Sequence, residues 1–154
     1  MRDRDAEGRA RNARPRDALG RPLPYGRAGV APVPDDIDAS PPAVVDLADQ
    51  LLDDGLPFQA HEVLEAAWKA APPPQRAAWQ GMAQLAVALT HALRGNPVGA
   101  RRLRQRAEAN LAAGVLPEVA VALRERLRDL CDAAGAGHPP PPPPPEGVRD
   151  TDTG

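Results

Sequence analysis

Between residues 40 and 134, apolar side chains recur every three or four positions, the spacing that lines one face of an α-helix. Glycine and proline, which favour the ends and the starts of helices, divide this stretch into five segments. The predicted helices span about residues 41–54, 57–71, 75–94, 97–113 and 117–134. Short connections make successive helices pack antiparallel. The pattern therefore predicts an all-α fold, a compact bundle of about five antiparallel helices.

Two polar residues are well placed to cap helix starts. Ser40 precedes Pro41 and Asn96 precedes Pro97. In each pair the polar side chain can accept a backbone N–H of the first turn, where proline lacks an N–H at no cost. We therefore expect Ser40 and Asn96 to be helix caps.

The composition changes on both sides of the helical stretch. Residues 1–39 contain eight arginines among prolines and glycines, and residues 139–145 are seven consecutive prolines. Such segments bury too little apolar surface to offset the entropy of ordering the chain. We predict an arm at 1–39 that is disordered or extended, a helical domain at 40–134, and a disordered proline-rich tail at 135–154.

Charge and cysteine content narrow the classes of function only slightly. The formal net charge of −2 gives no strong nucleic-acid signal, and no run of about 18 apolar residues suggests a membrane span. A single cysteine, Cys131, and a start without an apolar leader favour the cytoplasm. No cofactor is indicated. The partner is unknown, with a small-molecule ligand as one possibility.

The third predicted helix is apolar on nearly all sides, yet its polar residues fall together. Gln80, Gln84 and His91 lie within an arc of about 40° at 100° per residue. On the second helix, His61 and Glu65 are four residues apart, so the carboxylate can reach the imidazole. Such pairing would raise the pKa of the histidine and lower that of the carboxylate.

An antiparallel turn at residues 72–74 places Glu65 level with Gly81, and His61 level with Leu85. We therefore expect Gly81 to be the close contact between the second and third helices. We also expect Gln84 to join His61 and Glu65 in one hydrogen-bonded cluster that borders a cavity.

Two functions fit these residues. In a ligand-binding or hydrolytic pocket, His61 is the general base, Glu65 orients it, and the pocket is lined by Glu62, Trp68, Gln80, Gln84 and His91. In a helical interaction module, the same polar residues only fix how the helices pack. The spacing His61-Glu62-x-x-Glu65 is not the zinc motif of metalloproteases, which has histidine in the last position. We predict no metal, with His61, Glu65 and His91 as the one weak alternative.

Other residues favour simpler interpretations. The fourth helix carries Arg101, Arg102, Arg104 and Arg106, which indicate a solvated face more than a phosphate site. Trp79 and Cys131 are expected to be packing residues.

Three ordered motifs in the chain resemble a known family. They are Phe58-x-x-His61-Glu62-Val63-Leu64-Glu65-x-x-Trp68, then Gln80-Gly81-x-x-Gln84-x-Ala86-x-Ala88-x-x-His91, then Arg94-Gly95-Asn96-x-x-Gly99-Ala100. Together they are similar to the domain of unknown function 309, over about residues 44–111. The arginine- and proline-rich arm resembles that of actinobacterial members. The resemblance implies a compact helical fold with the histidine, glutamate and glutamine positions as its signature, and it implies no established activity.

Overall fold

The fold is taken from a computed structural model of the chain. The structure describes residues 3–4, 10–11, 17, 19, 33–34 and 36–136. Most of the predicted arm at 1–39 and nearly all of the predicted tail at 135–154 lie outside the described residues.

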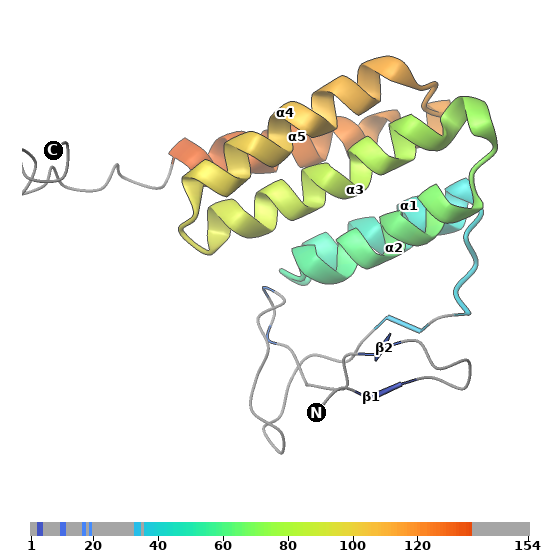
Figure 1. Ribbon diagram of the computed structural model, residues 1–154, viewed down its shortest axis with the longest axis horizontal. Helices are drawn as coiled ribbons and strands as arrows, with labels where there is room; N and C mark the ends of the chain where they lie inside the picture. Colours follow the sequence, from blue (N-terminus) through green and yellow to red (C-terminus); the bar gives the residue numbers. More distant parts are fainter. Residues whose placement is uncertain are drawn as a thin grey trace, which may run out of the picture.

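Within the described part of the chain, five α-helices make up the domain (Figure 1). They are α1 (Pro41–Asp53), α2 (Pro57–Ala70), α3 (Pro73–Leu93), α4 (Pro97–Ala113) and α5 (Val121–Ala136), and a 3₁₀ turn, η1 (Glu118–Ala120), precedes α5. The all-α prediction is confirmed. Two short strands were not predicted: β1 (Asp3–Arg4) and β2 (Ala10–Arg11) pair antiparallel, with Asp3 opposite Arg11.

Proline opens each of the first four helices, where its missing N–H leaves no hydrogen bond unmade. The predicted start of the third helix at Gln75 is two residues late. Pro73 and Pro74 both lie inside the first turn of α3, and Pro72 is the extended residue before it, with ψ of 154°. The first turn tolerates consecutive prolines because its N–H groups have no partners within the helix.

The two predicted caps differ. Asn96 accepts the backbone N–H of Gly99 at 3.1 Å, so its prediction is confirmed. Ser40 stands before α1, but its side chain makes no capping hydrogen bond, and its own N–H donates to Asp38 Oδ1 at 2.9 Å. The prediction for Ser40 is therefore wrong in its chemistry. The turns after α1 and α3 use Gly55 and Gly95 at φ of 73° and 80°, which favour glycine.

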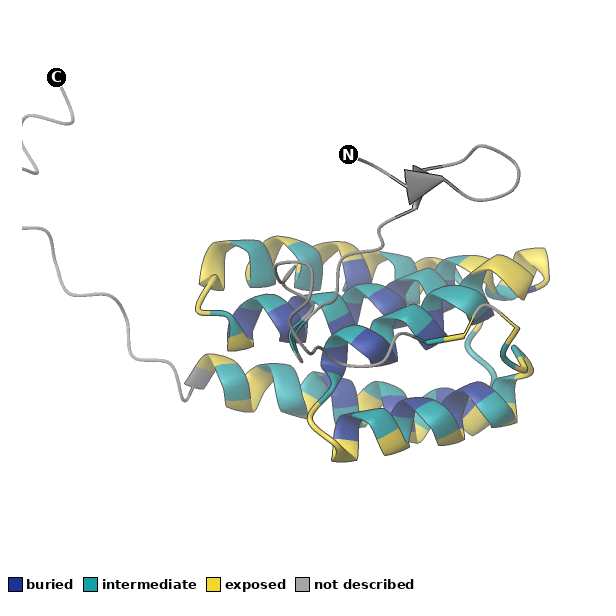
Figure 2. Cartoon of the chain, turned by 90° about the horizontal axis from the view of Figure 1, so that it is seen from below, coloured by how far each residue is buried: buried dark blue, intermediate teal, exposed yellow. Residues whose placement is uncertain are grey.

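The helix α3 is the centre of the bundle and packs against α2, α4 and α5, while α1 packs against α2 (Figure 1). Buried positions face inward along the helices, and exposed ones cover the outside (Figure 2). The largest fully buried side chains include Trp79, Leu64, Met82 and Leu85. Two residues ahead of α1, Val33 and Ile37, are partly buried against this core. The core thus extends beyond the helices themselves.

Glycine brings α3 and α4 into close contact at two heights. A Cβ on Gly81 would lie 2.7 Å from the carbonyl oxygen of Ala107 and 2.8 Å from Leu111 Cγ. About one turn nearer the start of α3, a Cβ on Gly114 would lie 2.5 Å from the backbone nitrogen of Ala78. Gly81 is therefore a contact glycine, as expected, but its neighbour is α4 and not α2. The prediction had the right residue and the wrong partner helix.

Two sets of ion pairs attach α5 to its neighbours. Arg126 reaches α1, where it bonds Asp49 Oδ1 at 2.9 Å and Asp53 Oδ1 at 2.6 Å. Arg128 binds both carboxylate oxygens of Glu108 on α4, at 3.0 and 2.6 Å. Two parallel bonds from one guanidinium fix orientation as well as distance. These pairs set the position of α5 relative to α1 and α4.

Arg104 extends the second set of ion pairs. Its Nε donates to Glu108 Oε2 at 3.0 Å, and its Nη1 donates to Asp132 Oδ1 of α5 at 3.0 Å. The hydrogen bonds from Arg128, followed by those from Arg104, hold the pKa of Glu108 below its usual range although its partial burial acts the other way. Arg104 is thus committed to the contact between α4 and α5.

We expect Gly81→Ala to lower the free energy of unfolding by about 1–3 kcal/mol, because the new methyl group overlaps the Ala107 carbonyl. This loss outweighs the roughly 1 kcal/mol by which alanine favours helix over glycine. Urea unfolding followed by circular dichroism measures the difference.

The matched control is Gly135→Ala in α5, where an added Cβ meets nothing within 4 Å. Here only the helix preference operates, so the variant should be as stable as the parent or slightly more stable. A Gly81→Ala protein that matches or exceeds the stability of the parent would show that the backbones of α3 and α4 have room at this height.

Candidate functional site

His61 and Glu65 lie on one side of α2, one helical turn apart. His61 Nε2 is 3.5 Å from Glu65 Oε2, and Glu65 Oε1 is 3.4 Å from Lys69 Nζ on the next turn. Exposure rises along this row, from 17% of the His61 side chain to 68% of Lys69. The predicted pairing of His61 with Glu65 is present, at the edge of α2 where the surface begins.

The predicted pKa shift of His61 has the wrong sign. Glu65 and the Phe58 carbonyl act to raise the pKa of the imidazole, but burial lowers it by more, so the net shift is downward. The ring of Phe58 is 5.2 Å away by centroids, tilted by 51°. His61 Nδ1 is buried, and no hydrogen bond of ordinary geometry reaches it. The phenyl ring and the surrounding core favour a neutral imidazole.

Gln84 does not join His61 and Glu65. Its Oε1 accepts a hydrogen bond from Asn110 Nδ2 of α4 at 2.7 Å, and within the described residues no hydrogen bond connects it to either α2 residue. The expected cluster of three is therefore wrong. The physical reason is rotation about the α3 axis: Gly81 and Gln84 both face α4, so the polar arc of α3 borders α4.

His91 lies in the last turn of α3, beside the turn that leads to α4. Its Nδ1 is 3.0 Å from Asn96 Nδ2, and Asn96 Oδ1 accepts the N–H of Gly99 at 3.1 Å. Because Gly99 requires an acceptor, the amide of Asn96 must turn its NH₂ group toward His91. Nδ1 of His91 then accepts, and the proton of the neutral ring is on Nε2. The ring braces the cap of α4.

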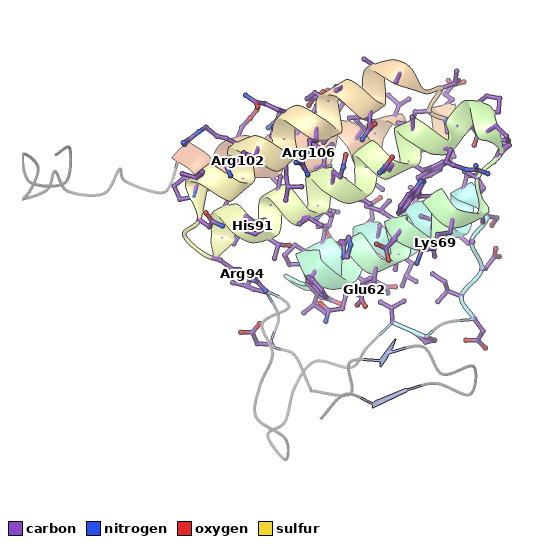
Figure 3. All side chains as sticks on the ribbon, in the orientation of Figure 1. Glu62, Lys69, His91, Arg94, Arg102 and Arg106 are labelled. Atoms are coloured by element: carbon purple, nitrogen blue, oxygen red, sulfur yellow. The ribbon has the colours of Figure 1, made fainter. Side chains whose placement is uncertain are left out.

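The remaining predicted binding residues do not converge on His61. Trp68 is partly buried and packs on the core. Glu62 is half-buried on α2 (Figure 3). Gln80 is half-buried on α3 and makes no side-chain hydrogen bond among the described residues. The structure therefore separates the predicted site into a row on α2 and a set of contacts between α3 and α4.

The weak metal alternative of His61, Glu65 and His91 fails on the same geometry. His61 and Glu65 are neighbours, but His91 lies in the last turn of α3, where its Nδ1 contacts Asn96 of the next turn. Across the residues that the structure describes, no three His, Cys, Asp or Glu side chains gather closely enough to hold an ion.

Asn110 is the residue that sequence reasoning missed. Asparagine is a poor helix former in a helix interior, and Asn110 lies inside α4, between Ala109 and Leu111. That mismatch was the available signal: a polar residue that costs helix stability here has a partner on another element. The partner, Gln84, is half-buried across the contact between α3 and α4.

Two other observations bear on the environment of the protein. No helix in the described residues is both long and apolar enough to cross a membrane. Cys131 is half-buried on α5, where its Sγ lies 3.5 Å from the carbonyl oxygen of Leu85 and burial raises its pKa to about 11. Its expected role in packing agrees with this position.

We expect the stability of the chain to fall with pH partly through His61. Burial holds the folded-state pKa of His61 below its ordinary value of 6.5, so the folded chain takes up fewer protons than the unfolded chain as the pH falls. The neutral imidazole contributes its full share of stability above pH 6.5, and this contribution is lost as the pH falls toward the folded-state pKa. His61→Gln should therefore lose less stability than the parent between about pH 7 and 5, by at most about 1.4 kcal/mol per pH unit.

Urea unfolding at several pH values measures both proteins. Above neutral pH the two curves should run parallel, because the imidazole is neutral in both states, and this range is the internal control. Parallel curves at acid pH as well would mean that His61 protonates as easily folded as unfolded.

A second prediction separates the two possible partners of Gln84. A double-mutant cycle of Gln84→Ala with Asn110→Ala should give a coupling of about 0.5–1.5 kcal/mol, the size of one hydrogen bond. The matched cycle of Gln84→Ala with Glu65→Ala should give coupling close to zero. The reverse result would restore the three-residue cluster between α2 and α3.

With this geometry in place, the comparisons with known proteins can be interpreted. Residues 46–103 match the family model described as a domain of unknown function (DUF309). The matched region runs from within α1 through α2 and α3 into α4. It includes His61, Glu65, Gln84 and His91, but ends before Asn110.

A curated protein also matches. The chain is 53% identical over 47 residues to "Uncharacterized protein YpuF" of Bacillus subtilis (strain 168). That stretch is 30% of this chain and only 27% of the relative, so the chain covers about a quarter of the length of that protein. No solved structure matches. The expected actinobacterial type finds no support in either match. The part of the chain from residue 46 to 103 is therefore similar to the family described as a domain of unknown function (DUF309).

Proposed function

We propose that this domain is a non-catalytic helical interaction module whose polar signature residues hold the helices in place. Of the two functions that the sequence left open, this one agrees better with the contacts. Gln84 bonds Asn110 across α3 and α4, and His91 braces the cap made by Asn96. These residues act within the fold and do not line a common site with His61.

The observation that carries the proposal is the position of the two ring nitrogens of His61. A general base needs one nitrogen within hydrogen-bond reach of the substrate and a partner that orients the other. Nδ1 of His61 is buried against its own helix, and Nε2 lies beside Glu65. The carboxylate therefore occupies the side on which a substrate would have to bind. The two side chains therefore contact each other at the edge of α2 and leave no ring nitrogen of His61 for a substrate.

One observation favours the runner-up, a hydrolytic or ligand-binding pocket with His61 as base. Burial lowers the pKa of His61, so the imidazole is neutral at pH 7, and neutrality is a requirement for a base. The same shift follows from simple burial in a packed edge, which needs no substrate.

The test compares the parent with the double variant His61→Gln, Glu65→Gln. Both chains are tagged and purified from the cells in which the protein occurs, and co-purifying proteins are quantified by isotope labelling. We expect the same set of partners in unchanged amounts, because the exposed surface outside the pair is the same. Loss of a cellular phenotype by a variant that is folded and keeps all its partners would support the pocket instead.

A further control addresses the architectural role directly. Replacing the pair by His61→Leu with Glu65→Leu should leave the free energy of unfolding equal or higher, because desolvating the pair offsets much of its attraction. A strongly destabilised leucine variant would mean that the edge of α2 needs these polar groups.

A further inference from the structure

The outer face of α4 carries positive charge that the fold itself does not use. Arg104 is committed to Glu108 and Asp132. Arg101, Arg102 and Arg106 are exposed, and none of the ion pairs in residues 36–136 includes them. Arg102 and Arg106 follow α4, across α3 from Glu62 and Lys69 of α2 (Figure 3). The chain as a whole has a formal net charge of −2, so this positive charge is confined to one surface.

These arginines belong to a longer row, which we term the α4 stripe. Its members are all exposed and are spaced four, four, three and four residues apart: Val98, Arg102, Arg106, Ala109 and Ala113. This spacing keeps side chains on one line along a helix. The row has apolar or small residues at its ends and two arginines between them. From Val98 to Ala113 there are 15 residue steps, or about 22 Å at roughly 1.5 Å per residue.

The same row has the features of a helix-packing surface. Small residues such as Ala109 and Ala113 permit close approach of a second helix, and Val98 is 48% exposed at the other end. Leu93, at the end of α3, is 47% exposed as well. A helix with the complementary pattern would have apolar residues at both ends and acidic residues in the middle.

A nucleic acid fits this surface less well. No aromatic residue is among the exposed large hydrophobic side chains of the described residues, so bases have nothing to stack on. A phosphate backbone would use the arginines but leave Val98 and Leu93 against a polar surface.

We propose that the α4 stripe docks an acidic amphipathic helix of a partner protein, whose carboxylates one turn apart bind Arg102 and Arg106 while flanking apolar residues contact Val98 and the alanines. Carboxylates at i and i+4 have the same spacing as the two arginines, so both pairs form at once. This inference rests on the proposed function as an interaction module and names its surface and the chemistry of its partner.

The test uses the full chain and a labelled four-turn helical peptide with two central glutamates four residues apart and a leucine one turn to either side. Fluorescence anisotropy measures the Kd. Arg102→Glu with Arg106→Glu should raise the Kd at least tenfold, because two attractive contacts become repulsive. Val98→Asp should raise it severalfold. Arg102→Lys with Arg106→Lys should retain most of the binding, because the charge stays.

The matched control is Lys69→Glu with Arg76→Glu, which makes the same change in net charge on α2 and at the start of α3. Its Kd should equal that of the parent. If the control and the stripe variants raise the Kd equally, the peptide binds by general charge attraction and the proposal is wrong. Equal binding of a peptide with glutamine in place of glutamate would do the same.

Two further outcomes also contradict the proposal. In the first, the parent chain shows no binding of the peptide up to a concentration of about 1 mM, which corresponds to the weakest Kd of interest. In the second, a duplex DNA of about 20 base pairs binds the same arginines more tightly than the peptide does, which would make the stripe a nucleic-acid surface. Failure of the proposed function has a different signature. In that case the double variant His61→Gln, Glu65→Gln remains folded and binds the peptide like the parent, yet loses a cellular phenotype.

Discussion

The backbones of α3 and α4 lie closer together at Gly81 and Gly114 than any side chain would permit, and the arrangement of the other helices follows from that contact. The N–H of Val115 donates to the carbonyl of Pro74 at 2.9 Å, which joins the end of α4 to the start of α3. At the opposite end, Asn96 and His91 hold the turn. With both ends and the middle constrained, the two helices can neither slide nor rotate past one another.

This constraint explains which parts of the fold and the candidate site could be predicted. Glycine stops and proline starts are local signals, so the helices were placed within a few residues, and Asn96 was recognised as a cap. Counting residues from the turn at 72–74 also predicted which residues of α2 and α3 lie at the same level along the helix axes. Height alone does not say which neighbour a side chain faces. Gln84 faces α4 because Gly81 does, and the sequence offers no local signal for that rotation.

The pKa of His61 is a second case in which local spacing was insufficient. A carboxylate four residues away is visible in the sequence, whereas the amount of protein around an imidazole is a property of the assembled bundle. Where the two effects oppose, burial prevails because it acts on the whole ring, while Glu65 is itself partly exposed. The arginines of α4 show the same limit. Arg104 pairs with Glu108 of its own helix, which spacing can suggest, but its second partner, Asp132, is brought to it only by the position of α5.

The thiol of Cys131 has a practical consequence for chemistry on this chain. With a pKa of about 11, only ~10⁻⁴ of it is thiolate at pH 7, and the thiolate is the reactive form. Its sulfur is also half-buried against the carbonyl of Leu85. A cysteine introduced at an exposed position would therefore react with maleimides or spin labels far ahead of the native thiol. The single native cysteine can stay in place while probes are attached elsewhere on the surface.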